Sequence, residues 1–274
     1  MPRQIISAGE TNNLSNFAEK SDNEKRLTLK KCVGALAVGL TAVGAGLFMS
    51  EGVAQASGYD VAIIVGGAGD GTSQGLEHEL WNNGTLYQGE EVIDVNYPAQ
   101  MGPIVGNVPT NQSVAMGISA VEASVYAHSG ADITLYGFSE GAFVTNGAAA
   151  DLANQGIYVN VMNSGDGNGS AGILASPIAQ SFKPITDSLG IQETPPVPGT
   201  VEKLDANDVW ASNAAGDIGK IINDGLNIQN HRVISPSEVP DEAFTENGVT
   251  YLVYDGTIPV PQGATLVPIP PEYR

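Results

Sequence analysis

The sequence predicts an α/β fold in which a mainly parallel sheet is flanked by helices on both faces. Two kinds of segment alternate along the chain: β-branched runs that end at a glycine, and stretches with apolar residues at helical spacing. Of the 274 residues, 42% are hydrophobic and 15% are charged. That composition excludes general disorder and is sufficient for one substantial core.

The β-branched runs give the expected strands, at Tyr59–Val65, Glu91–Val95, Asp132–Tyr136, Ile157–Met162 and Val201–Leu204. The first run is apolar throughout, which is typical of a strand buried on both faces. Apolar or small residues at helical spacing give the expected helices, at Ser113–His128, Gly141–Gln155 and Ile218–Leu226. Strands joined by helices favour parallel pairing.

Two stretches interrupt this alternation and are expected to be lid-like loops. Tyr97–Asn111 contains three prolines, and Gly165–Thr200 begins with a Gly/Asn cluster. Long irregular loops in a compact domain are usually functional or mobile. The last residues, Asn247–Arg274, predict a hairpin around Asp255-Gly256, followed by a tail at the edge of the sheet.

The N-terminal segment 1–56 has the pattern of a secretory signal. Basic residues precede an uncharged apolar run, Cys32–Met49, and Ala54-Gln55-Ala56 follows as a small-x-small cleavage pattern. We therefore expect a mature domain of residues 57–274 that is secreted or associated with the cell envelope. The apolar run is also nearly long enough to cross a bilayer, so an uncleaved N-terminal anchor is the alternative.

The net charge narrows the range of partners. Eleven Lys and Arg against 30 Asp and Glu give −19, so the chain should repel nucleic acid. Cys32 is the single cysteine, which excludes a disulfide framework and a Cys-rich metal site. We expect no cofactor and no metal.

Gly137-Phe138-Ser139-Glu140-Gly141 matches the G-x-S-x-G pattern of the α/β-hydrolase nucleophile elbow. A predicted strand precedes it and a predicted helix follows it, which is the setting that this motif requires. Ser139 is therefore the candidate nucleophile. We expect the oxyanion to be bound by two backbone N–H groups, those of Glu140 and of Gly67 in the loop after the first strand.

The general base is sought among three histidines. The nucleophile, acid and base of this fold follow one another in that chain order, so only His231 stands late enough. His78 and His128 are interpreted as surface or structural residues. The acid must lie between Ser139 and His231, where Asp208, Asp205 and Asp166 each follow a predicted strand.

Four short blocks of sequence resemble the PE-PPE domain, a cutinase-like α/β-hydrolase family of mycobacteria and related actinobacteria. They are Val65–Gly69, Tyr97–Gln100, Gln112–Gly117 and Tyr136–Ala142. The resemblance implies Ser139 as nucleophile and His231 as base. Asn207-Asp208-Val209-Trp210 resembles the aspartate segment of cutinase-like enzymes, which favours Asp208. Glu140 departs from the glutamine usual after the nucleophile.

The resemblance implies a serine esterase or lipase-like hydrolase that acts on acyl esters through an acyl-enzyme. An acyltransferase to trehalose or another envelope glycolipid acceptor is the first alternative, because some relatives carry out that transfer. The second is a catalytically inactive hydrolase fold that binds the envelope. The expected partner is an acyl ester or a glycolipid, with peripheral association with the envelope and no nucleic acid.

Overall fold

The computed structural model describes residues 60–181, 183–211 and 230–274. All of them belong to one compact unit, Gln55–Arg274. The predicted leader 1–56 and the predicted helix Ile218–Leu226 lie outside the described residues.

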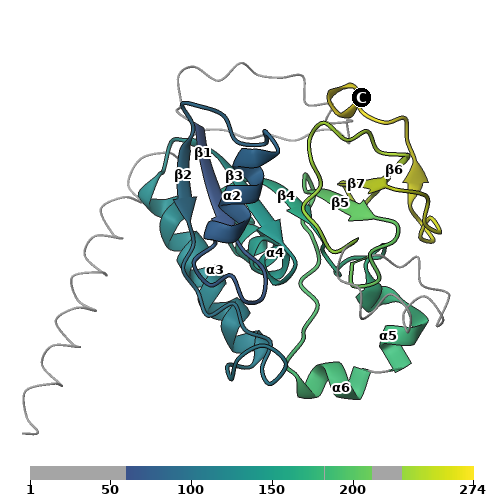
Figure 1. Ribbon diagram of the computed structural model, residues 1–274, viewed down its shortest axis with the longest axis horizontal. Helices are drawn as coiled ribbons and strands as arrows, with labels where there is room; N and C mark the ends of the chain where they lie inside the picture. The colour runs from purple at the N-terminus through teal and green to yellow at the C-terminus, as the bar shows by residue number, and fades with distance from the viewer. Residues whose placement is uncertain (1–59, 182, 212–229) are drawn as a thin grey trace, which may run out of the picture. The chain divides into compact units, whose positions relative to one another are not determined.

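The described chain forms one eight-stranded sheet in the order β2-β1-β3-β4-β5-β7-β6-β8 (Figure 1). The strands are β1 (Asp60–Val65), β2 (Glu91–Asp94), β3 (Asp132–Phe138), β4 (Asn160–Ser164), β5 (Val201–Asp205), β6 (Glu242–Glu246), β7 (Val249–Tyr254) and β8 (Thr265–Leu266). All pairings from β2 across to β7 are parallel, and only β6 pairs antiparallel, with β7 and β8. The predicted α/β fold with a mainly parallel sheet is confirmed.

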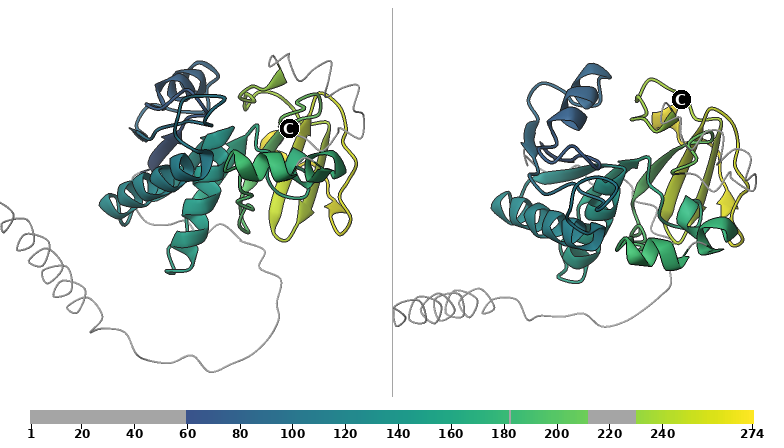
Figure 2. Two further views of the ribbon diagram at one scale, coloured as in Figure 1. Left: turned by 90° about the horizontal axis from the view of Figure 1, so that it is seen from below. Right: turned by 60° about the horizontal axis from the view of Figure 1, so that its bottom comes forward.

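Helices cover both faces of the parallel strands (Figures 1 and 2). One face carries α3 (Thr110–Ala127) and α4 (Glu140–Ala153), and the other carries α2 (Gln74–Asn82). The loop after β4 contains α5 (Pro177–Ser181), α6 (Lys183–Ser188) and a 3₁₀ turn at Ile173–Ala175, and a second 3₁₀ turn, Pro271–Tyr273, lies near the C-terminus. None of the described helices is both long and apolar enough to span a bilayer.

β1 shows why its sequence is apolar without interruption. Val61, Ile63 and Val65 pack toward α3 and α4, whereas Ala62 and Ile64 pack toward α2. All five side chains are at most 1% exposed. A strand between two helical layers has no solvent face, so the alternation typical of half-buried strands is lost.

Several strand boundaries differ from the prediction by one to three residues, and those at the start of β4 and the end of β3 bear on the site. β4 begins at Asn160, three residues later than expected, because the chain leaves α4 through a turn in which Ile157 N–H donates to the Leu152 carbonyl. β3 continues through Gly137 to Phe138 rather than ending before the glycine. This extension delivers the chain directly into the predicted elbow.

The C-terminal hairpin is present, but its turn was predicted in the wrong place. β6 and β7 are joined at Asn247-Gly248, with φ of 50° and 82°, as a two-residue hairpin of mirror-image type requires. Asp255-Gly256 follows β7 instead, and the Gly256 N–H donates to Asp241 Oδ2 at 2.8 Å.

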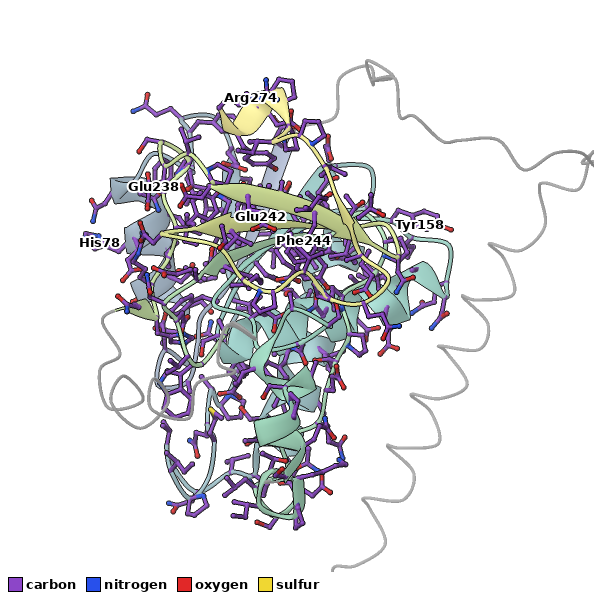
Figure 3. The ribbon with its side chains drawn as sticks, turned by 90° about the vertical axis from the view of Figure 1, so that its right-hand side faces the viewer. His78, Tyr158, Glu238, Glu242, Phe244 and Arg274 are labelled. Atoms are coloured by element: carbon purple, nitrogen blue, oxygen red, sulfur yellow. The ribbon has the colours of Figure 1, made fainter. Side chains whose placement is uncertain are left out.

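Phe244 on β6 is fully buried and stacks on Tyr251 of β7, with ring centroids 4.9 Å apart. Figure 3 shows Phe244 within the β6 ribbon and Arg274 above it, at the C-terminal end of the chain. β8 covers the outer edge of β6, so the predicted edge tail is confirmed.

We expect Gly141→Ala to be strongly destabilising, because a Cβ at Gly141 would collide with the backbone carbonyl of Val65. Overpacking of this kind costs roughly 1–3 kcal/mol or more. Gly84→Ala is the matched control, since its Cβ would meet nothing within 4 Å and only the positive φ of 79° opposes alanine. Urea denaturation followed by circular dichroism measures both. A Gly141→Ala protein as stable as Gly84→Ala would contradict the close packing at this point.

Candidate active site

Ser139 occupies a strained turn between β3 and α4. Its φ of 55° and ψ of −119° lie where residues with a Cβ are rarely found, which is typical of a nucleophile elbow. The turn is fixed on both sides: Ser139 N–H donates to the Ser164 carbonyl at 3.1 Å, and Ala142 N–H donates to the Ser139 carbonyl at 3.0 Å. The Ser139 side chain is half-buried, so it remains reachable from solvent.

The glycines around Ser139 are required by close contacts. A Cβ at Gly137 would lie 2.5 Å from Asn163 Oδ1 and 2.6 Å from Thr145 Oγ1. A Cβ at Gly67 would lie 2.9 Å from the Cβ of Ser139. The loop after β1 therefore packs directly against the elbow, as expected of the second wall of an oxyanion hole.

Two backbone donors flank the serine. Glu140 is the first residue of α4, so its N–H has no partner within the helix and lies at the positive end of the helix dipole. Gly67 is the second residue after β1. Within the described part of the chain, neither N–H group has a hydrogen-bond acceptor. Both are therefore available to a developing oxyanion.

His231 and Asp208 form a hydrogen-bonded pair. Asp208 Oδ2 lies 2.8 Å from His231 Nδ1, and the Trp210 N–H donates to Asp208 Oδ1 at 2.9 Å. The Asp208 side chain is 2% exposed and that of His231 is 17% exposed. With Nδ1 bound to a carboxylate, Nε2 is the nitrogen left to accept a proton.

The His231 ring lies beside the elbow. Its centroid is 4.8 Å from that of Phe138, the residue before Ser139. A Cβ at Gly165 would come within 3.0 Å of His231 Cε1, and Gly165 directly follows Ser164, which accepts the Ser139 N–H. The segments that carry the three candidate residues thus meet at the carboxyl ends of β3, β4 and β5.

The other two histidines lie elsewhere. His78 is exposed on α2, and Figure 3 shows it at the outer side of the molecule. His128 Nδ1 contacts the Ser124 carbonyl at 2.7 Å, and its Nε2 lies 3.4 Å from Glu91 at the start of β2. His128 is therefore at the opposite end of the strands from the elbow.

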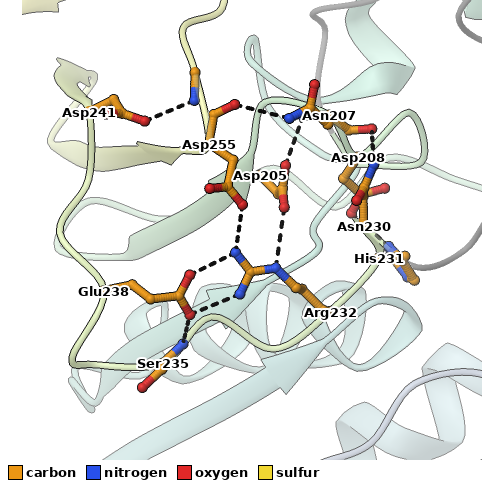
Figure 4. Close-up of polar contacts among 11 residues, drawn as sticks. Asp205, Asn207, Asp208, Asn230, His231, Arg232, Ser235, Glu238, Asp241 and Asp255 are labelled. Atoms are coloured by element: carbon orange, nitrogen blue, oxygen red, sulfur yellow. Dashed lines mark hydrogen bonds and ion pairs between the residues drawn. The ribbon is translucent and has the colours of Figure 1, made fainter.

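The two alternative acids have other partners. Asp205 Oδ1 accepts the Asn207 N–H at 2.8 Å, and its Oδ2 lies 3.3 Å from Arg232 Nε (Figure 4). Asp166 accepts hydrogen bonds from the side chains of Asn146 and Asn168, at 2.8 and 2.6 Å. Among the three candidates in the described residues, Asp208 is the one that contacts His231.

A buried polar network below the elbow was missed in the sequence. Asn163 Nδ2 donates to Asn146 Oδ1 and to Glu202 Oε1, both at 3.0 Å, and Asn146 binds Asp166 in turn. Burial raises the pKa of Asp166 to about 6, and burial together with the Asp166 charge raises the pKa of Glu202 well above its usual range. The sequence signal for this buried network was Glu202, the one acidic residue within the predicted strand Val201–Leu204.

Glu140, outside this network, is a further buried acid. It is 2% exposed, and within the described residues neither carboxyl oxygen has an aligned hydrogen-bond partner. Burial raises its pKa to about 7, and the nearby Ser113 side chain and Gln100 backbone oppose that shift only in part. The carboxyl directly after the nucleophile is therefore substantially protonated near neutral pH.

Glu140→Gln should remove a pH-dependent loss of stability. The folded pKa of Glu140 is raised above its unfolded value of 4.5, so its contribution is present at low pH and is lost as pH rises through about 7. The free energy of unfolding of Glu140→Gln, relative to that of wild type, should therefore increase between pH 5 and pH 8 by on the order of 3 kcal/mol.

Urea titrations at several pH values measure this gain. Exposed Glu79→Gln on α2 is the control and should follow the wild type. A constant difference between Glu140→Gln and wild type across this range would show that Glu140 is already ionised at pH 5.

No cluster of three or more His, Cys, Asp or Glu side chains in the described ranges is placed to hold a metal ion.

The chemistry that the candidate site residues support is the activation of a hydroxyl group. A serine on a strained turn, a histidine held by a buried carboxylate and two free N–H groups form the arrangement used for acyl transfer.

Several solved structures resemble parts of this chain at low sequence identity. An acetylxylan esterase is 22% identical, with 42% of this chain and 67% of that one covered and a TM-score of 0.34. A cutinase-like protein from Cryptococcus sp. is 17% identical, with 57% and 80% covered and a TM-score of 0.39. A lipase-esterase related protein from Clostridium acetobutylicum is 12% identical, with 73% and 86% covered and a TM-score of 0.39.

No curated protein matches the chain in sequence. Residues 88–211 match the family model described as the PE-PPE domain. This range includes α3, the elbow, α4, β4, β5 and Asp208. The family resemblance predicted from the sequence is therefore confirmed over residues 88–211, the range that carries the elbow.

Proposed function

We propose that this protein is a serine esterase that hydrolyses acyl esters through a covalent acyl-enzyme on Ser139. The observation that carries the proposal is the 2.8 Å contact between His231 Nδ1 and buried Asp208, beside a serine in a strained elbow. An idle turn has no need of backbone strain or of a histidine held by a buried carboxylate.

In the proposed reaction, His231 Nε2 accepts the Ser139 proton as Oγ attacks the ester carbonyl. The oxyanion accepts hydrogen bonds from the N–H groups of Glu140 and Gly67. Asp208 holds the imidazole in the required tautomer and stabilises the imidazolium, which then protonates the leaving alcohol. Water, activated by the same histidine, releases the acid and restores Ser139.

The same acyl-enzyme would serve transfer to a sugar hydroxyl. Products of an acyl ester are therefore compared by mass spectrometry with and without trehalose. Free acid in both cases supports the esterase, and acylated trehalose would identify an acyltransferase instead.

Ser139→Ala should abolish turnover of an acyl ester and labelling by a fluorophosphonate, because the probe reacts only with an activated serine. Ser164→Ala, which alters the neighbouring β4 position but keeps the carbonyl that binds Ser139 N–H, is the matched control. Equal labelling of wild type and Ser139→Ala would rule out this nucleophile. No labelling of folded wild type would favour the inactive binding module.

Asp208→Asn should lower kcat by up to roughly 10⁴, because the amide no longer holds the imidazole tautomer or its positive charge. Asp205→Asn should cost only about 10-fold, since Asp205 contacts the Asn207 N–H and Arg232 rather than the histidine. Circular dichroism normalises both rates to folded protein. The reverse order of effects would make Asp205 the acid.

We also propose that residues 1–56 direct export and are cleaved, so that exported protein begins at Ser57. The basis is the basic, apolar and small-residue pattern of the leader. N-terminal sequencing of protein from culture medium and envelope fractions tests this. Full-length chain found only in sedimented membranes would indicate the retained anchor.

A further inference from the structure

We propose that Arg232 is a positioning residue for the reaction: through Asp205 it fixes the segment that carries His231 against the turn that carries Asp208. This inference rests on the proposed esterase function. It concerns a residue that touches neither the substrate nor the reacting atoms.

Arg232 binds three carboxylates from three separate segments (Figure 4). Its two terminal nitrogens donate to the two oxygens of Glu238, at 2.8 and 2.7 Å. Nη2 also donates to Asp255 Oδ2 at 2.8 Å, and Nε lies 3.3 Å from Asp205 Oδ2. The planar guanidinium thus uses its fork geometry, which an ammonium group does not have.

Asp205 links this cluster to the catalytic turn. It stands at the end of β5 and is 2% exposed. While Oδ2 faces Arg232, Oδ1 accepts the Asn207 N–H and the Asp205 carbonyl accepts the Asp208 N–H at 3.0 Å. One buried residue therefore contacts the neighbour of His231 on one side and the Asp208 turn on the other.

Two further contacts join the same segments. Asn230 Nδ2 donates to the Asn207 carbonyl at 3.3 Å, and Asn207 Nδ2 donates to the Asp255 carbonyl at 2.9 Å. Asn230 and Arg232, which flank His231, are thus hydrogen-bonded to the turn that holds Asp208 or to Asp205, which fixes that turn. The aligned pair His231–Asp208 lies between these ties.

The charges in this cluster make Arg232 hard to replace. Burial raises the pKa of Asp205, and Arg232 opposes that shift, whereas hydrogen bonding to Arg232 lowers the pKa of Glu238. The nearby cation Lys203 is buried, which lowers its own pKa to about 8. Without Arg232, Asp205 would remain as a buried carboxyl facing Asp255 without its counterion, and the turn would be free to shift.

The proposal predicts a loss of rate with little loss of binding. A displacement of about 1 Å between catalytic groups can cost up to roughly 10²-fold in rate. Arg232→Gln should lower kcat for a soluble acyl ester about 100-fold and leave KM nearly unchanged, and Arg232→Lys should lower it about 10-fold. Arg274→Lys is the control, because within the described residues the Arg274 side chain hydrogen-bonds only to the Ile269 carbonyl and is exposed.

A second measurement reports on geometry without catalysis. The proton between His231 Nδ1 and Asp208 should give a downfield proton NMR signal, assigned by its absence from Asp208→Asn. Arg232→Gln should broaden or lose this signal while its circular dichroism stays native. Asp205→Asn should weaken it less, and the double variant Arg232→Gln/Asp205→Asn should be no slower than Arg232→Gln alone, because the two residues act through one contact.

Two results would overturn the proposal: folded Arg232→Gln with the wild-type kcat and NMR signal, or losses from Arg232→Gln and Asp205→Asn that multiply in the double variant. If Arg232→Gln does not fold, Arg232→Lys decides by the same two readouts. A wild type that does not react with fluorophosphonate would refute the proposed function. The NMR signal would then still show whether Arg232 holds the His231–Asp208 pair.

Discussion

The candidate active site depends on how closely backbone segments approach one another around Ser139. The Ser139 conformation is unfavourable for a residue with a Cβ, and it persists because neighbouring contacts hold it. The Ser164 carbonyl binds its N–H, the loop after β1 packs against its Cβ, and α4 begins immediately after it. Glycines at 67, 137 and 141 make these approaches possible.

Buried carboxyls are the second feature that shapes the site. Asp166 and Glu202 share a network of asparagine side chains below the elbow, and Glu140 is buried directly after the serine. Asp205 is the last residue of β5, and Asp208 lies in the turn that follows it. In a chain of net charge −19, most acids serve solubility. Four of these five acids accept hydrogen bonds from neighbouring residues. Glu140 has no aligned hydrogen-bond partner among the described residues, and burial raises its pKa.

Much of the fold and the candidate triad could be predicted from the sequence, because both depend on local patterns. The uninterrupted apolar run of β1 indicated two covered faces, and the glycines of the elbow indicated close packing before any contact was known. The start of β4 and the hairpin turn were misplaced. Ile157 is as apolar as a strand residue but belongs to a turn, and Asn247-Gly248 was overlooked in favour of Asp255-Gly256.

Long-range pairing could not be predicted from local pattern. The chain order left Asp166, Asp205 and Asp208 as alternatives because each follows a strand, and only the family resemblance favoured Asp208. Only the three-dimensional arrangement shows Asp166 turned toward Asn146, Asp205 toward Arg232 and Asp208 toward His231. The Arg232 cluster joins residues up to 50 positions apart along the chain, from Asp205 to Asp255, so no local motif indicates it.

The most direct test of the central claim is to trap the acyl-enzyme. Wild-type protein is mixed briefly with an activated acyl ester, quenched in acid and mapped by peptide mass spectrometry. The account predicts a single acyl group on the peptide that contains Ser139, attached to the Ser139 hydroxyl. This group should form in a rapid burst before steady turnover. Ester hydrolysis with the acyl group on another residue, or with no acylated intermediate and no burst, would contradict it.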